Sequence, residues 1–415
     1  MQILFLHQNF PGQYRHLAPA MAQRSGNRVF GLGQNETPSI PGITQLRYKA
    51  PEAGKTTPHP YLLRTEGHIR HGQAAARAAL QLREKGFRPD LICAHPGWGE
   101  GLFLKDVFPD AKLIFYWEFY FRARGGDIGF EPPGVEVSLD EAARTRVQNT
   151  IQLIQLEAAD WGVSPTRWQW SRYPDSARSR ISVIHEGIDT AVATPDGPAE
   201  FRLADGRLLT REDEVATYVA RNLEPYRGFP QFMRALPILQ RQRPKAQVVV
   251  VGGDSVSYGR APAQGGSWRE VMLREMEGKI DLSRVHFVGR LPYPQLLSLF
   301  RLTQAHLYLT YPFVLSWSML DAMACGAPIL GSATPPVLEV IQDGVNGRLV
   351  DFFDPEAIGT GLAAMLADPA AQAPIRQAAR QHVLEHYDLA RICLPRQIAL
   401  LEAVAAGQPG PVLAE

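Results

Sequence analysis

The stretch YPFVLSWSMLDAMACGAPI, from Tyr311 to Ile329, has the pattern of a strand end, a short loop and a helix closed by Gly326. Ser316 is suited to cap this helix, which would leave the N–H groups of its first turn free beyond the strand end. The one acid, Asp321, stands among small and apolar residues. A carboxylate there could accept two hydrogen bonds from a vicinal diol such as a ribose. A helix acid paired with a nearby arginine is the alternative interpretation.

Short apolar runs alternate with helical patterns on both sides of this stretch, including helices expected at 61–86 and 140–159. Runs that are apolar on both faces are typical of parallel strands covered by helices. In the first half we expect strands at 2–7, 27–33, 90–95, 112–117, 160–164 and 181–187. In the second half we expect them at 214–221, 246–254, 284–291, 305–312, 328–332 and 347–353.

The fold class predicted from this alternation is α/β, with two Rossmann-like, doubly wound parallel-sheet domains. The chain has 415 residues, which suits two domains of about 200 residues each. A polar, Pro- and Gly-rich stretch marks the linker, so we place an N-terminal domain at 1–193 and a C-terminal ligand-binding domain at 194–385. We expect 386–415 to cross back as a helix to the first domain. The carboxyl ends of the strands would then face one another across a cleft, where such sheets bind ligands.

Composition excludes several classes of protein. The formal net charge is +1, which gives no indication of nucleic-acid binding. Three cysteines lie far apart in sequence and suggest neither a disulfide framework nor a metal site. We expect no signal peptide and no membrane span, and therefore a cytoplasmic protein. The basic helix pattern from Tyr61 leaves peripheral contact with an anionic membrane open, with a solvated helix face as the alternative.

The loops that follow the second-half strands carry candidate binding residues. In VARNLEPYRGF, Arg221 ends a strand and Arg227 precedes Gly228 and the next helix. Two guanidinium groups at a helix N-terminus would suit a diphosphate, since each offers a planar donor fork. Two solvated surface arginines are the alternative. The Gly-rich loop that begins at Gly253 could close over a ligand or serve as a plain connector.

The loops of the first half also carry polar residues. Gly12 follows the first strand and would let the backbone approach an anion, or it marks a plain turn. His95 and Glu100 follow another strand. Glu118 follows Trp117, and burial among aromatic rings would raise its pKa as a general acid or base requires. Burial for packing is the alternative. We expect no metal site, because acids and histidines lack metal-ligand spacing.

Taken together, these segments resemble a GT-B glycosyltransferase of the retaining family 4 type over almost the whole chain. VARNLEPYRG resembles the family's R…KG diphosphate motif, with Arg227 where lysine is usual, and VHFVGRLPYPQL resembles its base-binding segment. The stretch at 311–329 resembles the EGFG…EAMACG segment, and EVIQDGVNGRLV the segment after it. VSPTRW and VIHEGID resemble the end of the first domain.

The resemblance implies roles for individual residues. Arg221, Arg227 and Glu118 would be catalytic, and His95, Glu100 and Trp117 would lie on the acceptor side. In the family's pattern a glutamate binds the ribose where Asp321 stands here, and a sugar-binding glutamate stands at Phe313. The nucleotide sugar would contact Gly12, Gly253, Arg290, Phe313, Val314, Leu315, Ser316 and Asp321. Because a phenyl ring cannot accept the sugar's hydrogen bonds, we expect Phe313 to be an apolar wall and backbone N–H groups to take over.

The activity implied by the resemblance is transfer of a sugar from a UDP- or GDP-linked donor to an acceptor sugar, glycolipid or other small molecule, with retention of configuration. A role in polysaccharide or glycoconjugate biosynthesis is expected, with no metal and no cofactor beyond the donor. The alternatives are a nucleotide-sugar epimerase of the same fold and a catalytically silent nucleotide-binding subunit. The sequence leaves the donor sugar, the base, the acceptor and the oligomeric state open.

Overall fold

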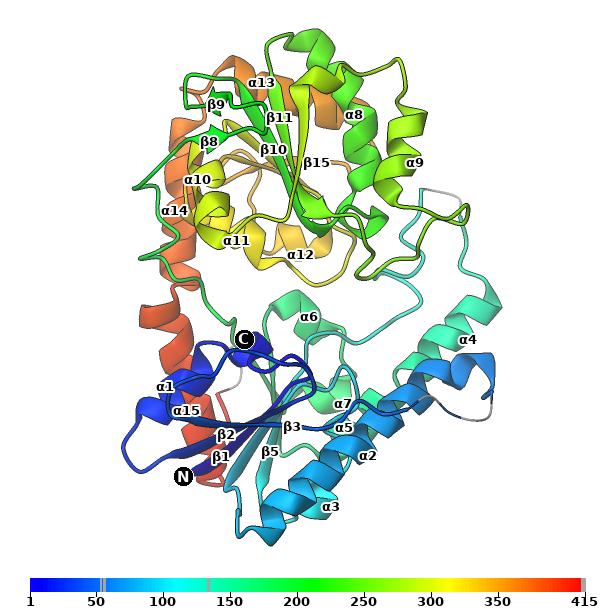
Figure 1. Ribbon diagram of the computed structural model, residues 1–415, viewed down its shortest axis with the longest axis vertical. Helices are drawn as coiled ribbons and strands as arrows, with labels where there is room; N and C mark the ends of the chain where they lie inside the picture. Colours follow the sequence, from blue (N-terminus) through cyan, green and yellow to red (C-terminus); the bar gives the residue numbers. More distant parts are fainter. Residues whose placement is uncertain (53, 55–56, 133–134, 412–415) are drawn as a thin grey trace. The chain divides into compact units, whose positions relative to one another are not determined.

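The chain forms two compact units in the computed structural model, which describes residues 1–52, 54, 57–132 and 135–411. One unit combines Met1–Gly187 with Leu389–Glu415, and the other is Ile188–Asp388 (Figure 1). The sequence had placed these boundaries at 193/194 and 385/386. Ile188 and Asp388 form a parallel bridge. The chain therefore enters and leaves the second unit at neighbouring points.

In its described residues the first unit holds a seven-stranded parallel sheet with the order β3-β2-β1-β4-β5-β6-β7. Its strands are β1 (Gln2–Leu6), β2 (Arg28–Gly33), β3 (Ile43–Arg47), β4 (Leu91–Ala94), β5 (Lys112–Tyr116), β6 (Trp161–Ser164) and β7 (Ile181–Val183). The order reverses between β1 and β4, as in doubly wound sheets. The edge strand β3 was not predicted, because its residues are only partly buried or exposed and give no apolar run.

Helices cover both faces of this sheet, which explains why its strands are apolar throughout. Ile3 and Phe5 of β1 join a core with residues of α1 (Leu17–Gln23) and α15 (Leu394–Ala405), which Figure 1 shows on the same face. Leu4 and Leu6 point the other way, into a core with α2 (Leu63–Glu84) and α3 (Leu104–Val107). The C-terminal helix therefore completes the core of the first unit.

One helix expected from the sequence is divided in two. The segment 140–159 forms α4 (Leu139–Gln148) and α5 (Thr150–Ala158), which meet at Asn149. The Asn149 side chain accepts a hydrogen bond from Phe121 N (3.0 Å) and donates one to Phe121 O (2.8 Å). The divided helix thus anchors the loop that follows β5. The remaining short helices of this unit are α6 (Arg167–Ser171) and α7 (Asp175–Arg178).

The second unit, whose residues are all described, holds a six-stranded parallel sheet with the order β12-β11-β10-β13-β14-β15. The strands are β10 (Val215–Asn222), β11 (Gln247–Gly253), β12 (Val285–Gly289), β13 (Ala305–Tyr308), β14 (Ile329–Ser332) and β15 (Arg348–Val350). All six were predicted from their apolar runs. The polar segment before β10 also contains a short antiparallel hairpin, β8 (Phe201–Arg202) with β9 (Leu208–Leu209), which the sequence did not indicate.

Helices also cover both faces of the second sheet (Figure 1). They are α8 (Phe229–Gln242), α9 (Trp268–Glu275), α10 (Tyr293–Leu302), α11 (Trp317–Ala324), α12 (Pro335–Leu338), α13 (Pro355–Ala367) and α14 (Ala373–His386). Gly359 lets α13 approach α8 closely, since a Cβ at that position would lie 2.7 Å from Ala235 O. The predicted class, two Rossmann-like α/β domains, is confirmed.

His306 on β13 makes the stability of the second unit dependent on pH. Its side chain is fully buried, with Nδ1 2.9 Å from Thr217 Oγ1, and burial lowers its pKa from 6.5 to about 3. Between pH 6.5 and 3 the unfolded chain therefore binds a proton that the folded chain does not. Stability should fall as pH falls through this window, by ~1.4 kcal/mol per pH unit.

The variant His306→Asn keeps a side chain able to hydrogen-bond Thr217 but does not titrate. Between pH 7 and pH 5 we expect the wild type to lose about 2 kcal/mol of unfolding free energy relative to this variant. Denaturant unfolding at the two pH values measures it. A difference that is the same at both pH values would show that the fold does not lower the pKa of His306.

Candidate functional site

Arg227 lies at the carboxyl edge of the second sheet, where a turn leads from β10 into α8. It ends the 3-10 turn η3 (Pro225–Arg227) and is followed by Gly228. Gly228 has a left-handed φ of +67°, and a Cβ there would lie 2.5 Å from the Cβ of Leu309. Only glycine readily adopts this φ and also leaves room for the Leu309 side chain. The turn therefore holds Arg227 at the N-terminus of α8, where backbone N–H groups and the helix dipole favour anions.

The Arg227 side chain is buried and fixed by three acceptors. Its Nη1 donates to Thr310 Oγ1 (2.7 Å), Val314 O (3.1 Å) and Tyr308 Oη (3.3 Å). Its guanidinium carbon lies 5.5 Å from the centre of the Tyr258 ring. Arg227 and Val314, both predicted as site residues, are thus joined by a direct hydrogen bond. A buried guanidinium of this kind is a preorganised positive charge.

Glu224 orders the Gly-rich loop after β11, a role that the sequence did not indicate. Its fully buried carboxylate accepts hydrogen bonds from the backbone N–H groups of Ser257 (3.1 Å), Tyr258 (3.1 Å) and Gly259 (2.9 Å). Three such bonds to one side chain fix the start of the loop. They place the Tyr258 ring beside Arg227. In the sequence, the indication of this role was an acid that lies between Arg221 and Arg227.

Phe313 is buried in an aromatic cluster rather than exposed. Its ring centre lies 5.0 Å from that of Tyr258 and 5.5 Å from that of Tyr226, and Tyr226 stacks on Tyr311 at 4.7 Å. Such contacts are favourable beyond the area they bury. At this position the chain therefore presents a wall of rings.

The loop between Phe313 and α11 differs in part from what we expected. Ser316 caps α11 as predicted, its side chain accepting from Ser318 N (3.4 Å). The expectation that Ser316 N–H would bind ligand is wrong, because it already donates to Tyr308 Oη at 2.8 Å. Among the described residues, the N–H groups of Val314 and Leu315 make no hydrogen bond. These two donors remain for an incoming acceptor.

Asp321 is 6% exposed in α11, and its Oδ1 accepts a hydrogen bond from Tyr293 Oη at 3.0 Å. The donor in this contact is a phenol. A carboxylate can accept hydrogen bonds from more than one donor at a time.

Arg221, Gly253 and Arg290 lie at the ends of neighbouring strands. Arg290 Nη2 donates to Asn222 Oδ1 (2.9 Å), and a Cβ on Gly253 would lie 2.7 Å from that oxygen and 3.0 Å from Arg290 Nε. Asn222 in turn donates to Ser257 Oγ at 2.6 Å. Arg221 is exposed and makes no hydrogen bond or ion pair within the described residues. Arg290 is therefore fixed in place, whereas Arg221 is available.

At the carboxyl edge of the first sheet, His7, His95 and Glu118 come together. The His7 and His95 rings are 5.1 Å apart, and His95 Nε2 lies 3.5 Å from Glu118 Oε2. Glu118 Oε1 also accepts from Gln13 Nε2 at 2.9 Å. Gly12 lies over His7, since a Cβ there would be 2.4 Å from His7 Nε2. His7 and Gln13 were missed, although His7 is the last residue of the first predicted strand.

Hydrogen bonds fix the tautomers of both imidazoles. His7 Nδ1 accepts from Asn9 N (2.9 Å) and His95 Nδ1 accepts from Gly97 N (3.0 Å), so both protons are on Nε2. Burial and the charge of His95 lower the pKa of His7 to about 3. Within the described residues, neither Nε2 has a well-formed hydrogen bond. The cluster thus combines buried N–H donors with one carboxylate acceptor.

The prediction that burial raises the pKa of Glu118 is wrong in direction. Burial alone would raise it, but the nearby His95 and His7 and the hydrogen bond from Gln13 together lower this pKa. The Glu118 side chain is 35% exposed and ionised at neutral pH. It is therefore an acceptor or base rather than a general acid.

Glu100 is the buried carboxyl group whose pKa is raised, chiefly by burial. Tyr48 Oη donates to its Oε1 at 2.7 Å and lies 3.3 Å from His71 Nδ1. Tyr48 and His71 were not predicted as site residues. Glu100 is 1% exposed. Glu100 therefore lies beneath the surface. Its hydrogen bond with Tyr48 holds the segment after β3, and Tyr48 in turn contacts α2.

Trp117 belongs to the core, which corrects its assignment to the acceptor side. It is 1% exposed and packs against Phe115 and Tyr173, with ring centres 5.0 and 5.5 Å away. A Cβ on Gly162 of the neighbouring strand would lie 2.1 Å from the Trp117 ring. The alternation of β5 continues through Trp117 and points its side chain inward, away from any ligand.

Within the described residues, no three or more His, Cys, Asp or Glu side chains form a group suited to a metal ion. No described helix is both long and apolar enough to cross a bilayer.

Two doubly wound units in one chain, one with a buried arginine at a helix N-terminus, define the GT-B class. Sucrose-phosphate synthase from Thermosynechococcus elongatus is similar in fold, with a TM-score of 0.72 and 19% identity over 98% of this chain and 100% of that one. HepE from Anabaena, solved in complex with UDP-glucose, has a TM-score of 0.68 and 16% identity over 98% and 100%.

Two family models match successive parts of the sequence. One is described as the glycosyl transferase family 4 group and matches residues 25–193, and the other as glycosyl transferases group 1 and matches residues 203–382. The chain belongs to the GT-B glycosyltransferases of the family 4 type.

Curated relatives share the sequence in part. D-inositol 3-phosphate glycosyltransferase from Mycolicibacterium vanbaalenii is 29% identical over 195 residues, which is 46% of this chain and 42% of that protein. The protein of the same name from Mycobacterium avium is 29% identical over 261 residues, 61% of this chain and 54% of that protein. The chain spans about half the length of these relatives.

Proposed function

We propose that the chain transfers a sugar from a nucleotide-sugar donor to a hydroxyl group of an acceptor, with retention of configuration. The observation that carries the proposal is the buried Arg227 guanidinium beside the glycine turn that opens α8. It is a fixed positive charge at a helix N-terminus, which suits the diphosphate of such a donor. The UDP-glucose complex of HepE supports a UDP-linked donor, and a GDP-linked donor remains the second choice.

In this scheme the bond between the anomeric carbon and the diphosphate oxygen breaks, and its electron pair stays with the diphosphate. The acceptor oxygen bonds to the same face of the sugar, and its proton passes to the departing diphosphate oxygen. Arg227, the first turn of α8 and the exposed Arg221 stabilise the charge that grows on the leaving group. The scheme requires no metal ion, because these groups supply the positive charge.

Glu118, His95 and His7 are proposed to bind the acceptor. A hydroxyl group can donate to the ionised Glu118 and accept from an imidazole Nε2–H at the same time. The acceptor is therefore a hydroxyl-bearing compound such as a sugar or a glycolipid. A role in glycoconjugate or polysaccharide synthesis in the cytoplasm, with or without peripheral membrane contact, would follow from such an acceptor.

Turnover of labelled nucleotide sugars tests the proposal. UDP- and GDP-linked sugars are incubated with and without a panel of sugar and glycolipid acceptors, and NMR of the product gives the anomeric configuration. We expect nucleoside diphosphate release that depends on acceptor, and a retained configuration. Conversion of the donor without acceptor would indicate the epimerase instead. Nucleotide binding without any turnover would indicate a silent binding subunit.

Asp321 is expected to bind the nucleotide rather than the sugar. Replacing it by asparagine should weaken binding of free nucleoside diphosphate and of nucleotide sugar equally, by ~1–3 kcal/mol, because a charged acceptor for a ribose diol is lost. Calorimetric titration of both ligands measures this. Tyr293→Phe is the control, since it removes the phenol that contacts Asp321 but keeps the carboxylate. A loss confined to the sugar-bearing ligand would assign Asp321 to the sugar.

A further inference from the structure

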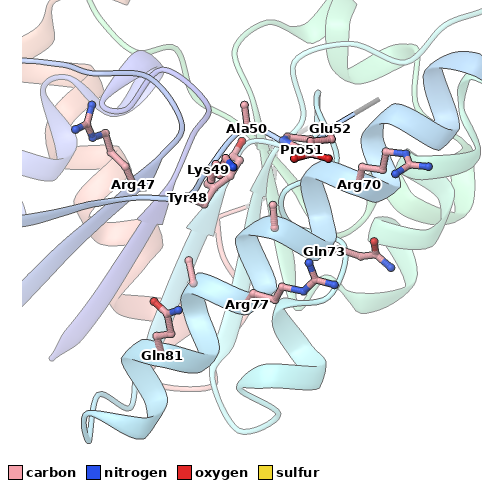
Figure 2. Close-up of a pocket in the computed structure, with 12 residues that line it drawn as sticks. Arg47, Tyr48, Lys49, Ala50, Pro51, Glu52, Arg70, Gln73, Arg77 and Gln81 are labelled. Carbon is pink, nitrogen blue, oxygen red and sulfur yellow. The ribbon is translucent and has the colours of Figure 1, made fainter. Parts of the chain in front are cut away.

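The first unit contains a cavity of about 490 Å³ that is separate from the His7–His95–Glu118 cluster. It lies between the segment after β3 and helix α2 (Figure 2). Its wall on one side is the segment Arg47–Glu52, and on the other a stripe of α2. The stripe consists of Arg70, Gln73, Ala74, Arg77, Ala78 and Gln81.

The cavity is lined by four cationic side chains and one carboxylate. Arg47 ends β3 and Lys49 follows it, Arg70 and Arg77 come from α2, and Glu52 is the one acid. Residues spaced by three or four along a helix share a face, which brings Arg70 and Arg77 to one side together with two glutamine amides. Figure 2 shows the polar side chains of α2 along the helix beside the segment that carries Lys49.

Much of this positive charge is not compensated. Arg47 pairs with Glu36 at 3.3 Å, but both side chains are mostly exposed, and such pairs are weak. Arg70 pairs with Glu66 one turn earlier on α2. Lys49 and Arg77 form no ion pair or hydrogen bond within the described residues. Two cations from opposite walls therefore remain for a ligand.

The walls of the cavity are held from beneath. Tyr48, which lines the cavity, is 4% exposed, and its hydroxyl group donates to the buried Glu100. The same hydroxyl lies 3.3 Å from His71 Nδ1 of α2, so Tyr48 connects its own wall of the cavity to the α2 wall. Gly72 of α2 packs on the loop after β4, since a Cβ there would lie 2.7 Å from Gly99 O. The two walls are therefore connected by buried contacts.

We propose that this cavity binds a small anionic group, a phosphate or a carboxylate, held by Lys49 and Arg77 with Arg47, Arg70 and the two glutamine amides. Guanidinium forks and amide N–H groups match the geometry of such an oxyanion. The carboxylates of Glu36, Glu52 and Glu66 lie around the cations and would repel an extended anionic surface, which favours a compact ligand. The source of the group is a phosphorylated acceptor, free phosphate or a lipid headgroup.

Binding of inorganic phosphate and of pyrophosphate, measured by calorimetric titration at low ionic strength, tests the proposal without any turnover. The pocket variant is Lys49→Gln with Arg77→Gln. The control is Arg64→Gln with Lys85→Gln, which changes the same charge at the two ends of α2 outside the cavity. We expect saturable binding by the wild type, at least tenfold weaker binding by the pocket variant, and binding within twofold of wild type by the control.

Equal thermal midpoints of the variants show that the fold is retained. Sedimentation with vesicles of phosphatidylglycerol and phosphatidylcholine separates the sources. Vesicle binding that only the pocket variant loses would support the site and identify the anion as a headgroup. Competition by sugar phosphates would support it and point to a phosphorylated small molecule. Equal losses in both variants, or no saturable binding of either anion, would overturn the proposal. These outcomes do not depend on whether the chain transfers sugar.

Discussion

Replacing Arg227 by alanine is expected to lower turnover of the nucleotide sugar by about 100-fold or more. The guanidinium is a buried, fixed charge at the N-terminus of α8, where the proposed diphosphate leaves. Removing one preorganised group that stabilises developing charge typically costs this much. Arg227→Lys keeps the charge but loses the planar fork, so an intermediate rate is expected. Steady-state kinetics with saturating acceptor measure both variants.

The same change should also lower stability, because the Arg227 side chain is buried and hydrogen-bonded. Arg227 donates to Thr310, Val314 and Tyr308, and its loss deprives these buried groups of that donor, at ~1–3 kcal/mol. Arg221 is the informative companion, because it is exposed. Arg221→Ala should reduce turnover without a change in stability. Arg234→Ala on α8, which breaks a largely exposed ion pair with Glu275 of α9, is the neutral control. Wild-type turnover in Arg227→Ala would refute the diphosphate site.

Replacing Glu118 by glutamine should lower kcat/KM for the acceptor by about 100-fold, toward the upper end of the range for a lost hydrogen bond to a charged group. Glutamine has the same shape but lacks the negative charge that strengthens the hydrogen bond from the acceptor hydroxyl group. Because the pKa of Glu118 is lowered, its carboxylate is ionised at neutral pH, and its activity is lost only as pH falls below the ordinary glutamate range. The acid limb of the pH profile should therefore lie below about pH 4.5.

Two measurements separate this role from a structural one. Glu118→Gln should leave the affinity for nucleoside diphosphate unchanged, since donor binding is assigned to the other unit. Glu157→Gln, an exposed substitution in the same unit, is the matched control and should behave as wild type. If Glu118→Gln weakens nucleotide binding as much as acceptor turnover, Glu118 serves the donor and the acceptor assignment fails.

The aromatic wall around Phe313 explains how the site departs from the family pattern. The Phe313 ring packs between Tyr226 and Tyr258. The backbone N–H groups of Tyr258 and of its two neighbours donate to Glu224, which fixes the position of Tyr258. A donor sugar near this position would meet ring faces rather than a carboxylate. Val314 and Leu315 offer two backbone N–H groups beside that wall, which supports recognition of the sugar by the main chain.

The sequence by itself determined the layered fold and the position of most strands. Runs such as 248–251 and 3–6 are apolar on both faces, and only a parallel sheet covered by helices buries both faces. It also located the loop at 311–329 and its cap at Ser316, because helix capping depends on neighbouring residues. Strand β3 was missed, since a partly exposed edge strand has no apolar run, and the break at Asn149 was missed because its partner, Phe121, is distant in sequence.

The tertiary structure alone decided the chemistry of the individual side chains. Glu118 is ionised because His95 and Gln13, which follow other strands, contact it. Trp117 is core because Gly162 of the adjacent strand leaves room for its ring. Arg227 is buried because Thr310 and Val314 supply acceptors from more than 80 residues away. The spacing of apolar residues is a local property and is written in the sequence, whereas a side chain's pKa, burial and partners depend on groups that only folding brings near.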